Sequence, residues 1–173
     1  MAYAFRLTPP LGAVLVLGFL AVPHAAAQSR EEKKPDAGKG KAPIVYHCVG
    51  FDEPLNKGPM QVGKGRVLPL RVKLADDSGG FGDDSAVKAH PIVRVAYQPE
   101  SGAEVDKTDE IDLRDYGVGR SFVFDKEAHW KFDLGTLKFK LEGTYKVTVL
   151  SGDEAEYKVD PTCELVFHLH GGH

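Results

Sequence analysis

From residue 44 onward, hydrophobic side chains recur at every second position instead of every third or fourth. In the stretch 68–74, four aliphatic residues alternate with Pro69, Arg71 and Lys73. Successive side chains of a β-strand point to opposite faces, so this pattern predicts a strand with one buried face. No part of the chain shows the apolar stripe of an amphipathic helix over about three turns. The alternation therefore excludes a helical fold and a doubly wound α/β fold.

The same reasoning predicts further strands, separated by turns that contain Gly, Asp and Ser. We expect strands at residues 44–51, 66–74, 91–97, 121–125, 129–134, 141–149, 155–159 and 163–169. Short strands with turn signals between them predict an all-β chain, an immunoglobulin-like antiparallel β-sandwich of about 7–9 strands. Because Pro69 lacks the N–H that a strand ladder needs, we expect it at a sheet edge or a bulge.

The first 27 residues are predicted to be a cleavable signal peptide. Arg6 precedes an apolar run over 11–22, and the small residues 25–27 follow it. A basic start, a short apolar run and a small-residue cleavage site are typical of secretory signals. The run is shorter than the about 20 apolar residues that a membrane-spanning helix needs. We predict cleavage after Ala27, no membrane insertion after that cleavage, and a secreted or periplasmic location.

The mature chain is predicted to be one domain behind a linker. Residues 28–43 hold no large apolar side chain and are expected to form a disordered linker, and residues 44–173 the domain. The formal net charge of −3 gives no surplus of Lys and Arg, so we expect no nucleic-acid partner. An edge that carries Pro69 opposes pairing of strands between molecules, so we expect a monomer.

Two cysteines lie near opposite ends of the predicted domain, Cys48 in its first strand and Cys163 in its last. First and last strands of an immunoglobulin-like sandwich often neighbour each other, and export delivers the chain to an oxidising compartment. We therefore favour a Cys48–Cys163 disulfide over two reduced, buried cysteines. Since the chain has no C-x-x-C motif, the expected role of the bond is stability and not redox catalysis.

Three closely spaced histidines, His168, His170 and His173, end the chain. Side chains two residues apart in a strand share a face, and imidazole nitrogens at that spacing suit a divalent transition-metal ion. His173 follows two glycines that would let it fold back as a third ligand. The alternative is a solvated strand end with a polar tail.

An acidic loop supplies Asp76, Asp77, Asp83 and Asp84, whose carboxylates suit calcium. Their spacing does not match an EF-hand loop, and Asp and Gly are also the ordinary residues of turns between strands. A calcium site and a solvated turn are therefore both open interpretations. The acidic loop 106–115 has the same two interpretations. Apart from such a divalent metal, no cofactor is expected.

Residues of catalytic type are present, but not in a catalytic pattern. Ser121, Asp125 and His129 are close in sequence, yet on a hairpin they are not expected to form a nucleophile–base–orienter line. Asp125 and Asp133 flank the same hairpin, where carboxylates more often form turns. The chain has no G-x-S-x-G elbow, H-E-x-x-H helix or phosphate-binding glycine loop. We expect no enzymatic activity and assign no catalytic residue.

The sequence GTYKVTV at 143–149 resembles the strand that carries the tyrosine corner of immunoglobulin-like domains. The sequence GRVLPLRV at 65–72, with the order of aromatic, Gly-Thr-Tyr and apolar motifs over 122–167, resembles PxKF-type domains. Arg71 and Val72 stand where that family has lysine and phenylalanine. The resemblance implies a β-sandwich module of exported bacterial proteins that acts as a surface or binding module, with no catalytic residues.

These observations predict an exported, non-catalytic module with a binding or structural role at the cell envelope. Its partner would be an unidentified protein or another envelope component. The alternative is a metal-binding or metal-handling periplasmic protein that uses His168, His170 and His173. Metal affinity measured with and without the last six residues separates the two hypotheses.

Overall fold

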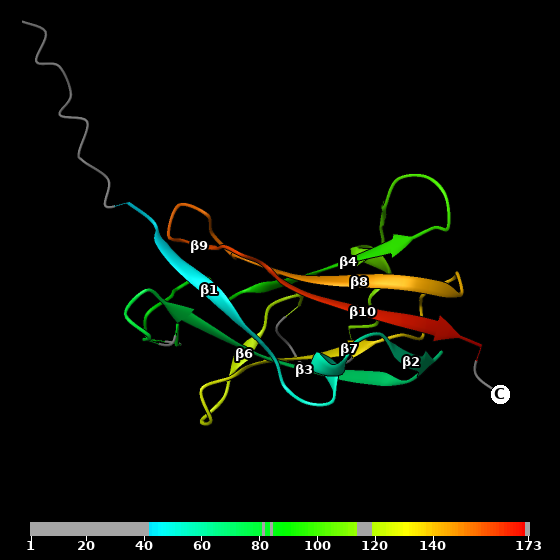
Figure 1. Ribbon diagram of the computed structural model, residues 1–173, viewed down its shortest axis with the longest axis horizontal. Helices are drawn as coiled ribbons and strands as arrows, with labels where there is room; N and C mark the ends of the chain where they lie inside the picture. Colours follow the sequence, from blue (N-terminus) through cyan, green and yellow to red (C-terminus); the bar gives the residue numbers. More distant parts are fainter. Residues whose placement is uncertain (1–41, 81, 84, 114–118, 172–173) are drawn as a thin grey trace, which may run out of the picture. The chain divides into compact units, whose positions relative to one another are not determined.

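The structure is a computed structural model that describes residues 42–80, 82–83, 85–113 and 119–171. Its elements are β1 (Ile44–Phe51), η1 (Leu55–Lys57), β2 (Met60–Gly63), β3 (Val67–Asp76), β4 (Ile92–Gln98), β5 (Val105–Asp106), η2 (Thr108–Glu110), β6 (Val123–Phe124), β7 (Trp130–Gly135), β8 (Gly143–Leu150), β9 (Tyr157–Val159) and β10 (Cys163–His170). The strands form two five-stranded sheets in the orders β6-β7-β3-β1-β9 and β2-β10-β8-β4-β5. Figure 1 shows β4, β8 and β10 in one layer and β3 and β7 in the other. The predicted all-β sandwich is therefore confirmed.

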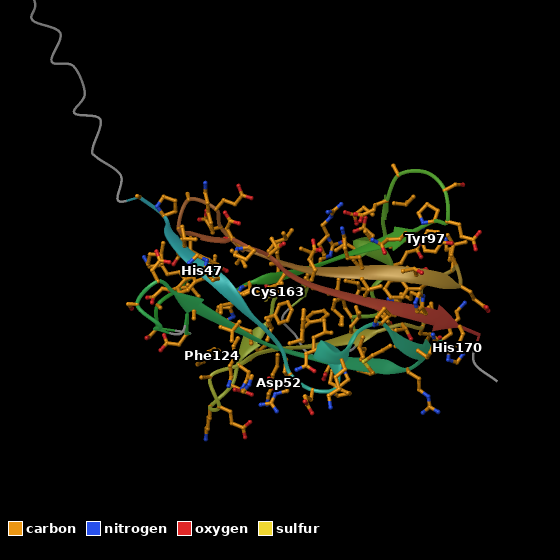
Figure 2. All side chains as sticks on the ribbon, viewed as in Figure 1. His47, Asp52, Tyr97, Phe124, Cys163 and His170 are labelled. Atoms are coloured by element: carbon orange, nitrogen blue, oxygen red, sulfur yellow. A yellow bond between two sulfur atoms is a disulfide. The ribbon has the colours of Figure 1, made fainter. Side chains whose placement is uncertain are left out.

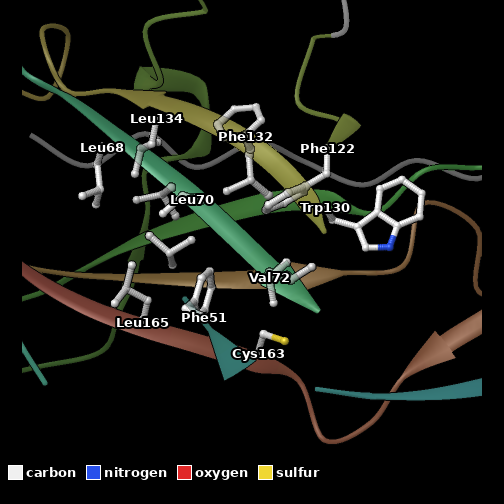
Figure 3. Close-up of a cluster of buried hydrophobic side chains, with 14 of the residues drawn as sticks. Phe51, Leu68, Leu70, Val72, Phe122, Trp130, Phe132, Leu134, Cys163 and Leu165 are labelled. Atoms are coloured by element: carbon white, nitrogen blue, oxygen red, sulfur yellow. The ribbon is translucent and has the colours of Figure 1, made fainter. Parts of the chain in front are cut away.

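The buried faces follow the alternation in the sequence. Four side chains of β3 that share a face are all buried: Leu68, Leu70, Val72 and Leu74. The same holds on β8 and β10, whose inward residues are Tyr145, Val147, Val149, Cys163, Leu165, Phe167 and Leu169. Trp130 and Phe132 of β7, and Phe122 just before β6, belong to the same buried cluster as the inward side chains of β3 (Figure 3). Close packing of these faces is what holds the two sheets together.

The described residues contain more strands than we expected, and not all of them pair antiparallel. β2 and β5 have four and two residues and were not predicted. β1 pairs parallel with β9, and β10 pairs parallel with β2, so an antiparallel sandwich is wrong for these two pairs. Parallel neighbours need a long connection, and both pairs join strands from opposite ends of the domain. Alternation reveals which face is buried but not in which direction a neighbouring strand runs.

Pro69 lies in β3, the middle strand of its sheet, so the prediction of an edge strand is wrong for β3 as a whole. β1 pairs with β3 only from Val72 to Asp76. Pro69 lies before this stretch and pairs only with Asp133 of β7. The missing N–H of Pro69 is tolerated because β1 has already ended there.

Two local features of the sandwich match their sequence predictions. The hydroxyl of Tyr145 donates a 2.7 Å hydrogen bond to the carbonyl of Leu141, as the tyrosine corner requires. Cys48 and Cys163 form a disulfide with their Cα atoms 5.1 Å apart. Their strands lie in opposite sheets and not side by side in one sheet, so the disulfide bonds one layer of the sandwich to the other. None of the helices in the described part of the chain is long and apolar enough to cross a bilayer.

Candidate functional site

A group of charged side chains, here called the Arg71 cluster, gathers beside the β6–β7 hairpin on the outer side of its sheet. Its members are Asp52, Arg71, Asp125, Glu127, His129 and Lys131. Arg71 comes from β3 and Lys131 from β7, where the two are direct cross-strand partners. Asp52 follows the end of β1, and Figure 2 shows it on the same side of the molecule as Phe124, the last residue of β6. Two adjacent cations on one sheet face require carboxylates nearby, and the hairpin turn supplies them.

Arg71 is the centre of the cluster. Its Nη2 donates to Oδ2 of Asp125 at 3.2 Å and to Oε2 of Glu127 at 2.5 Å, and it lies 3.3 Å from Nδ1 of His129. Its Nε lies 3.5 Å from Oδ2 of Asp52, within ion-pair range, but makes no hydrogen bond among the described residues. The hydrogen bond with Glu127 raises the pKa of Arg71 and lowers that of Glu127. The guanidinium therefore ties β3 to the hairpin turn and to the end of β1.

Asp125 and His129 are the most enclosed members of the cluster. Burial raises the pKa of Asp125, but a 2.6 Å contact with Lys131 Nζ and two backbone N–H donors, those of His129 and Glu127, outweigh burial and hold this pKa well below its ordinary value. Nε2 of His129 lies 3.1 Å from Oδ1 of Asp52. Since an Arg71 N–H points at Nδ1 of His129, a neutral ring would carry its proton on Nε2 and donate it to Asp52.

The Arg71 cluster contains side chains of metal-ligand type. Ligand atoms of Asp125, Glu127 and His129 all lie within 4.8 Å of one another. Nη2 of Arg71 contacts all three of these residues, so a guanidinium cation already lies where a metal ion would be bound. The geometry therefore fits an ion-pair network better than a metal centre. Ser121 is outside the cluster and bridges to Ile92, so Ser121 is not brought together with Asp125 and His129.

The C-terminal histidines lie partly within the described residues. His168 and His170 both have outward positions on β10. Nδ1 of His168 lies 2.9 Å from Oγ1 of Thr144 on β8, and Nδ1 of His170 lies 3.1 Å from the carbonyl oxygen of Gly171. The two rings are thus held by different partners. His173 lies outside the described residues, so the three-histidine metal site stays a prediction.

The acidic loop uses its described carboxylates for turns and contacts. Oδ1 of Asp76 and Oδ1 of Asp83 each accept three hydrogen bonds from donors within four residues of themselves. The hydroxyl of the serine two residues later is the main cause that lowers the pKa of each. Oδ1 of Asp77 lies 2.5 Å from Nε2 of His47. Asp84 lies outside the described residues, and the calcium site likewise stays a prediction.

A shallow pocket of about 180 Å³ adjoins the Arg71 cluster. Its walls are formed by Asp52, Glu53, Pro54, Leu55, Met60, Leu68, Pro69 and Arg71. It lies where β1 has ended and one flank of β3 is left unpaired. The cluster and the pocket could not be predicted from the sequence, because their residues come from four separate segments. The outward Arg71, opposite another cation, was the one signal available.

Comparisons with known proteins identify no family. No family model matches the chain, and no curated protein matches it. Among solved structures, domains 4 and 5 of the S-layer protein SbsC give a TM-score of 0.36 at 16% identity, over 75% of this chain and 54% of that one. The twitchin kinase region of C. elegans gives a TM-score of 0.27 at 12% identity, over 75% of this chain and 16% of that one. Structural and sequence similarity at this level supports no inference about function.

Proposed function

We propose that the chain is an exported, non-catalytic β-sandwich module that binds or supports another component of the cell envelope. The observation that carries the proposal is the Cys48–Cys163 disulfide between the two sheets. Such bonds persist in oxidising compartments outside the cytosol. The signal-peptide pattern of residues 1–27 and the resemblance of residues 65–72 to PxKF-type domains point the same way.

A binding role is supported better than a catalytic one by the Arg71 cluster and its pocket. Asp125 and Glu127 are paired with Arg71, and His129 is held between Asp52 and Arg71. Charged side chains that are paired with one another in this way stabilise the conformation of the surface. The walls of the adjoining pocket are mostly apolar, with Asp52, Glu53 and Arg71 as their charged members, which suits an apolar side chain of a partner protein.

The export part of the proposal is tested by expressing the full chain in a host with a periplasm. We expect the mature protein in the periplasmic fraction, beginning at Gln28, with no free thiol for Cys48 or Cys163. An unprocessed chain in the cytosol, or two free thiols in the exported protein, would contradict it. Mass spectrometry of the intact protein gives the first residue of the mature chain. The mass change on alkylation gives the number of free thiols.

The binding part is tested by placing a photo-crosslinking amino acid at Glu53, an exposed residue of the pocket wall. The matched control is Glu100, an exposed residue of the β4–β5 connection. In the native envelope we expect a discrete adduct from position 53 and none from position 100. Equal labelling from both positions, or none from either, would count against a partner at this pocket.

Metal handling is the second candidate function. A carbonyl oxygen only accepts, so Nδ1 of His170 must carry a proton where it faces Gly171, and Nε2 of the neutral ring then has a free lone pair for a metal. We expect nickel or copper titration of the mature chain to show binding that is lost without the last six residues and in His168→Asn/His170→Asn. Unchanged affinity in both variants would dismiss the histidines as ligands.

A further inference from the structure

One end of the sandwich is formed by two connections that pack against each other. The β2–β3 connection, residues 64–66, lies beside the β7–β8 connection, residues 136–142. The hydroxyl of Thr136 donates to the carbonyl of Arg66 at 2.8 Å, and the N–H of Thr136 donates to the same oxygen at 3.0 Å. The N–H of Lys64 donates to the carbonyl of His170 at 2.9 Å, where β10 ends. Figure 1 shows β2 and β10 ending together here, and Figure 2 marks this end with His170.

The β7–β8 connection is anchored in the core. Phe139 is fully buried and stacks on Tyr145, with the ring centroids 4.8 Å apart. Thr136 is fully buried as well. The two neighbours of Phe139, Lys138 and Lys140, are both exposed. Because the backbone that carries these exposed side chains is already fixed, little conformational freedom is lost when they contact a surface.

Three apolar side chains at this end are exposed to solvent. Val67, Leu137 and Leu141 are 36%, 54% and 44% exposed. Leu137 lies against Gly65, since a Cβ atom on that glycine would be 3.7 Å from Cδ1 of Leu137. Val67 pairs with Gly135, two residues before Leu137. Single exposed apolar residues need no explanation, but a group of them on adjoining segments is typical of an interaction surface.

The charge exposed at this end is mostly positive. Its exposed cations are Lys64, Arg66, Lys138 and Lys140. Two neighbouring carboxylates are largely enclosed and paired: Asp112 is 14% exposed and lies 3.3 Å from Nζ of Lys138, and Glu110 is 19% exposed and bonds to Lys107. Glu142 is the exposed carboxylate of the β7–β8 connection. Four cations and one anion are therefore presented to solvent beside the apolar side chains.

We propose that residues 64–67 and 137–142, here called the basic end, dock on a membrane surface that carries anionic phospholipids. Lys and Arg side chains are attracted to anionic headgroups, and leucine side chains beside them enter the boundary between headgroups and acyl chains. The exposed Leu137 and Leu141 favour a lipid surface over a purely polar polyanion, which would offer them no apolar environment. The inference rests on the proposed export to the envelope, but it uses neither the pocket nor the Arg71 cluster.

The basic end is tested by co-sedimentation of the purified mature chain with vesicles. One set contains phosphatidylglycerol and phosphatidylcholine in equal parts, and the other contains phosphatidylcholine alone. We expect binding to the anionic vesicles that weakens as salt is added, because salt screens attraction between exposed charges. Lys64→Gln/Arg66→Gln should weaken this binding about tenfold or more, since each basic side chain near an anionic surface adds affinity. Leu137→Asn should weaken it too, although it keeps every cation.

Matched controls lie at the other end of the domain, where β9 pairs with the start of β1. Lys88→Gln/Lys158→Gln removes two exposed cations, and the N–H of Lys88 bonds to Glu156 just before β9. Val45→Asn replaces an exposed apolar side chain of β1. We expect both controls to bind the anionic vesicles as the wild type does. All the substituted side chains are exposed, so the fold should be kept, and circular dichroism verifies this.

Any of three results would overturn the proposal. The first is equal binding to anionic and neutral vesicles, or binding to neither. The second is an undiminished affinity of Lys64→Gln/Arg66→Gln, which would assign binding to other basic residues, such as those in 28–43. The third is an equal loss in the control variants. Because the vesicles meet purified protein, a failed crosslink at Glu53 would reject the pocket as a binding site and leave the basic end standing.

Discussion

Nη2 of Arg71 lies 3.3 Å from Nδ1 of His129, and the same nitrogen also donates to Asp125 and Glu127. A guanidinium thus lies at the centre of three side chains that elsewhere would suit a metal ion. Arg71 and Lys131 together balance the negative charges of this hairpin turn, Arg71 at Glu127 and Lys131 at Asp125.

Replacing Arg71 by Met should therefore destabilise the domain. The change removes the 2.5 Å partner of Glu127 and one contact each of the enclosed Asp125 and His129, but Arg71 is about one third exposed, so water compensates in part. We expect a loss of about 1–3 kcal/mol of unfolding free energy. Urea unfolding measures it, with the exposed Arg66→Met as the matched control. Equal effects of the two changes would show that the cluster adds no stability.

Removing the disulfide should cost more than any single hydrogen bond. It closes a loop with a sequence separation of 115, and disulfides typically contribute about 2–4 kcal/mol. The double variant Cys48→Ala/Cys163→Ala should unfold at a lower urea concentration than the wild type, and dithiothreitol should shift the wild type but not the variant. A wild-type midpoint that reductant leaves in place would contradict the bond.

Removing the hydroxyl of Tyr145, which forms the tyrosine corner, should lower the free energy of unfolding. Tyr145→Phe keeps the buried ring but leaves the carbonyl of Leu141 without its 2.7 Å donor. We expect a loss of about 1 kcal/mol in unfolding free energy. Tyr97→Phe is the control, because Tyr97 packs edge-on against Tyr145 and no hydrogen bond of its hydroxyl is found among the described residues. A larger effect at Tyr97 would argue against the corner.

Stability should fall in acid because carboxylates bind protons more weakly in the folded state. The folded pKa values of Asp76, Asp83 and Asp125 are all lowered, so their contribution is complete above the unfolded value of about 4 and is lost as pH falls through the folded values. The urea midpoint should therefore drop between pH 5 and pH 2, by less in Asp125→Asn. His47 has the opposite sign, since its raised pKa adds stability below about 6.5.

Periodicity was sufficient to predict the main strands and their buried faces. The four inward aliphatic residues of β3 and the inward residues of β10 were identified correctly, because burial of one face imposes the two-residue repeat. β2 and β5 were not predicted, because strands of four and two residues are too short to show the two-residue repeat of hydrophobic side chains. The parallel pairing of β1 with β9 and of β10 with β2 was not predicted, because the direction of neighbouring strands depends on how the chain passes between the sheets.

The disulfide could be predicted from the sequence because the chain has only two cysteines, which leave a single pairing, and carries a signal-peptide pattern. The Arg71 cluster was not, since alternation marks Arg71 only as outward, and its partners belong to a turn and to the end of another strand. Asp125 was interpreted as a turn former, which is correct: its Oδ1 accepts the N–H of Glu127 and of His129. Its second oxygen holds Lys131, a role that only the folded geometry reveals.

The bond between the first and the last strand also determines how the domain transmits tension. A force that pulls on β1 from Ile44 and on β10 from His170 reaches Cys48 and Cys163 within a few residues and passes directly across their sulfur atoms. The chain between the two cysteines is then bypassed and carries no load. Under traction the oxidised domain should extend only by its short outer segments, whereas the reduced domain would unravel along its whole length.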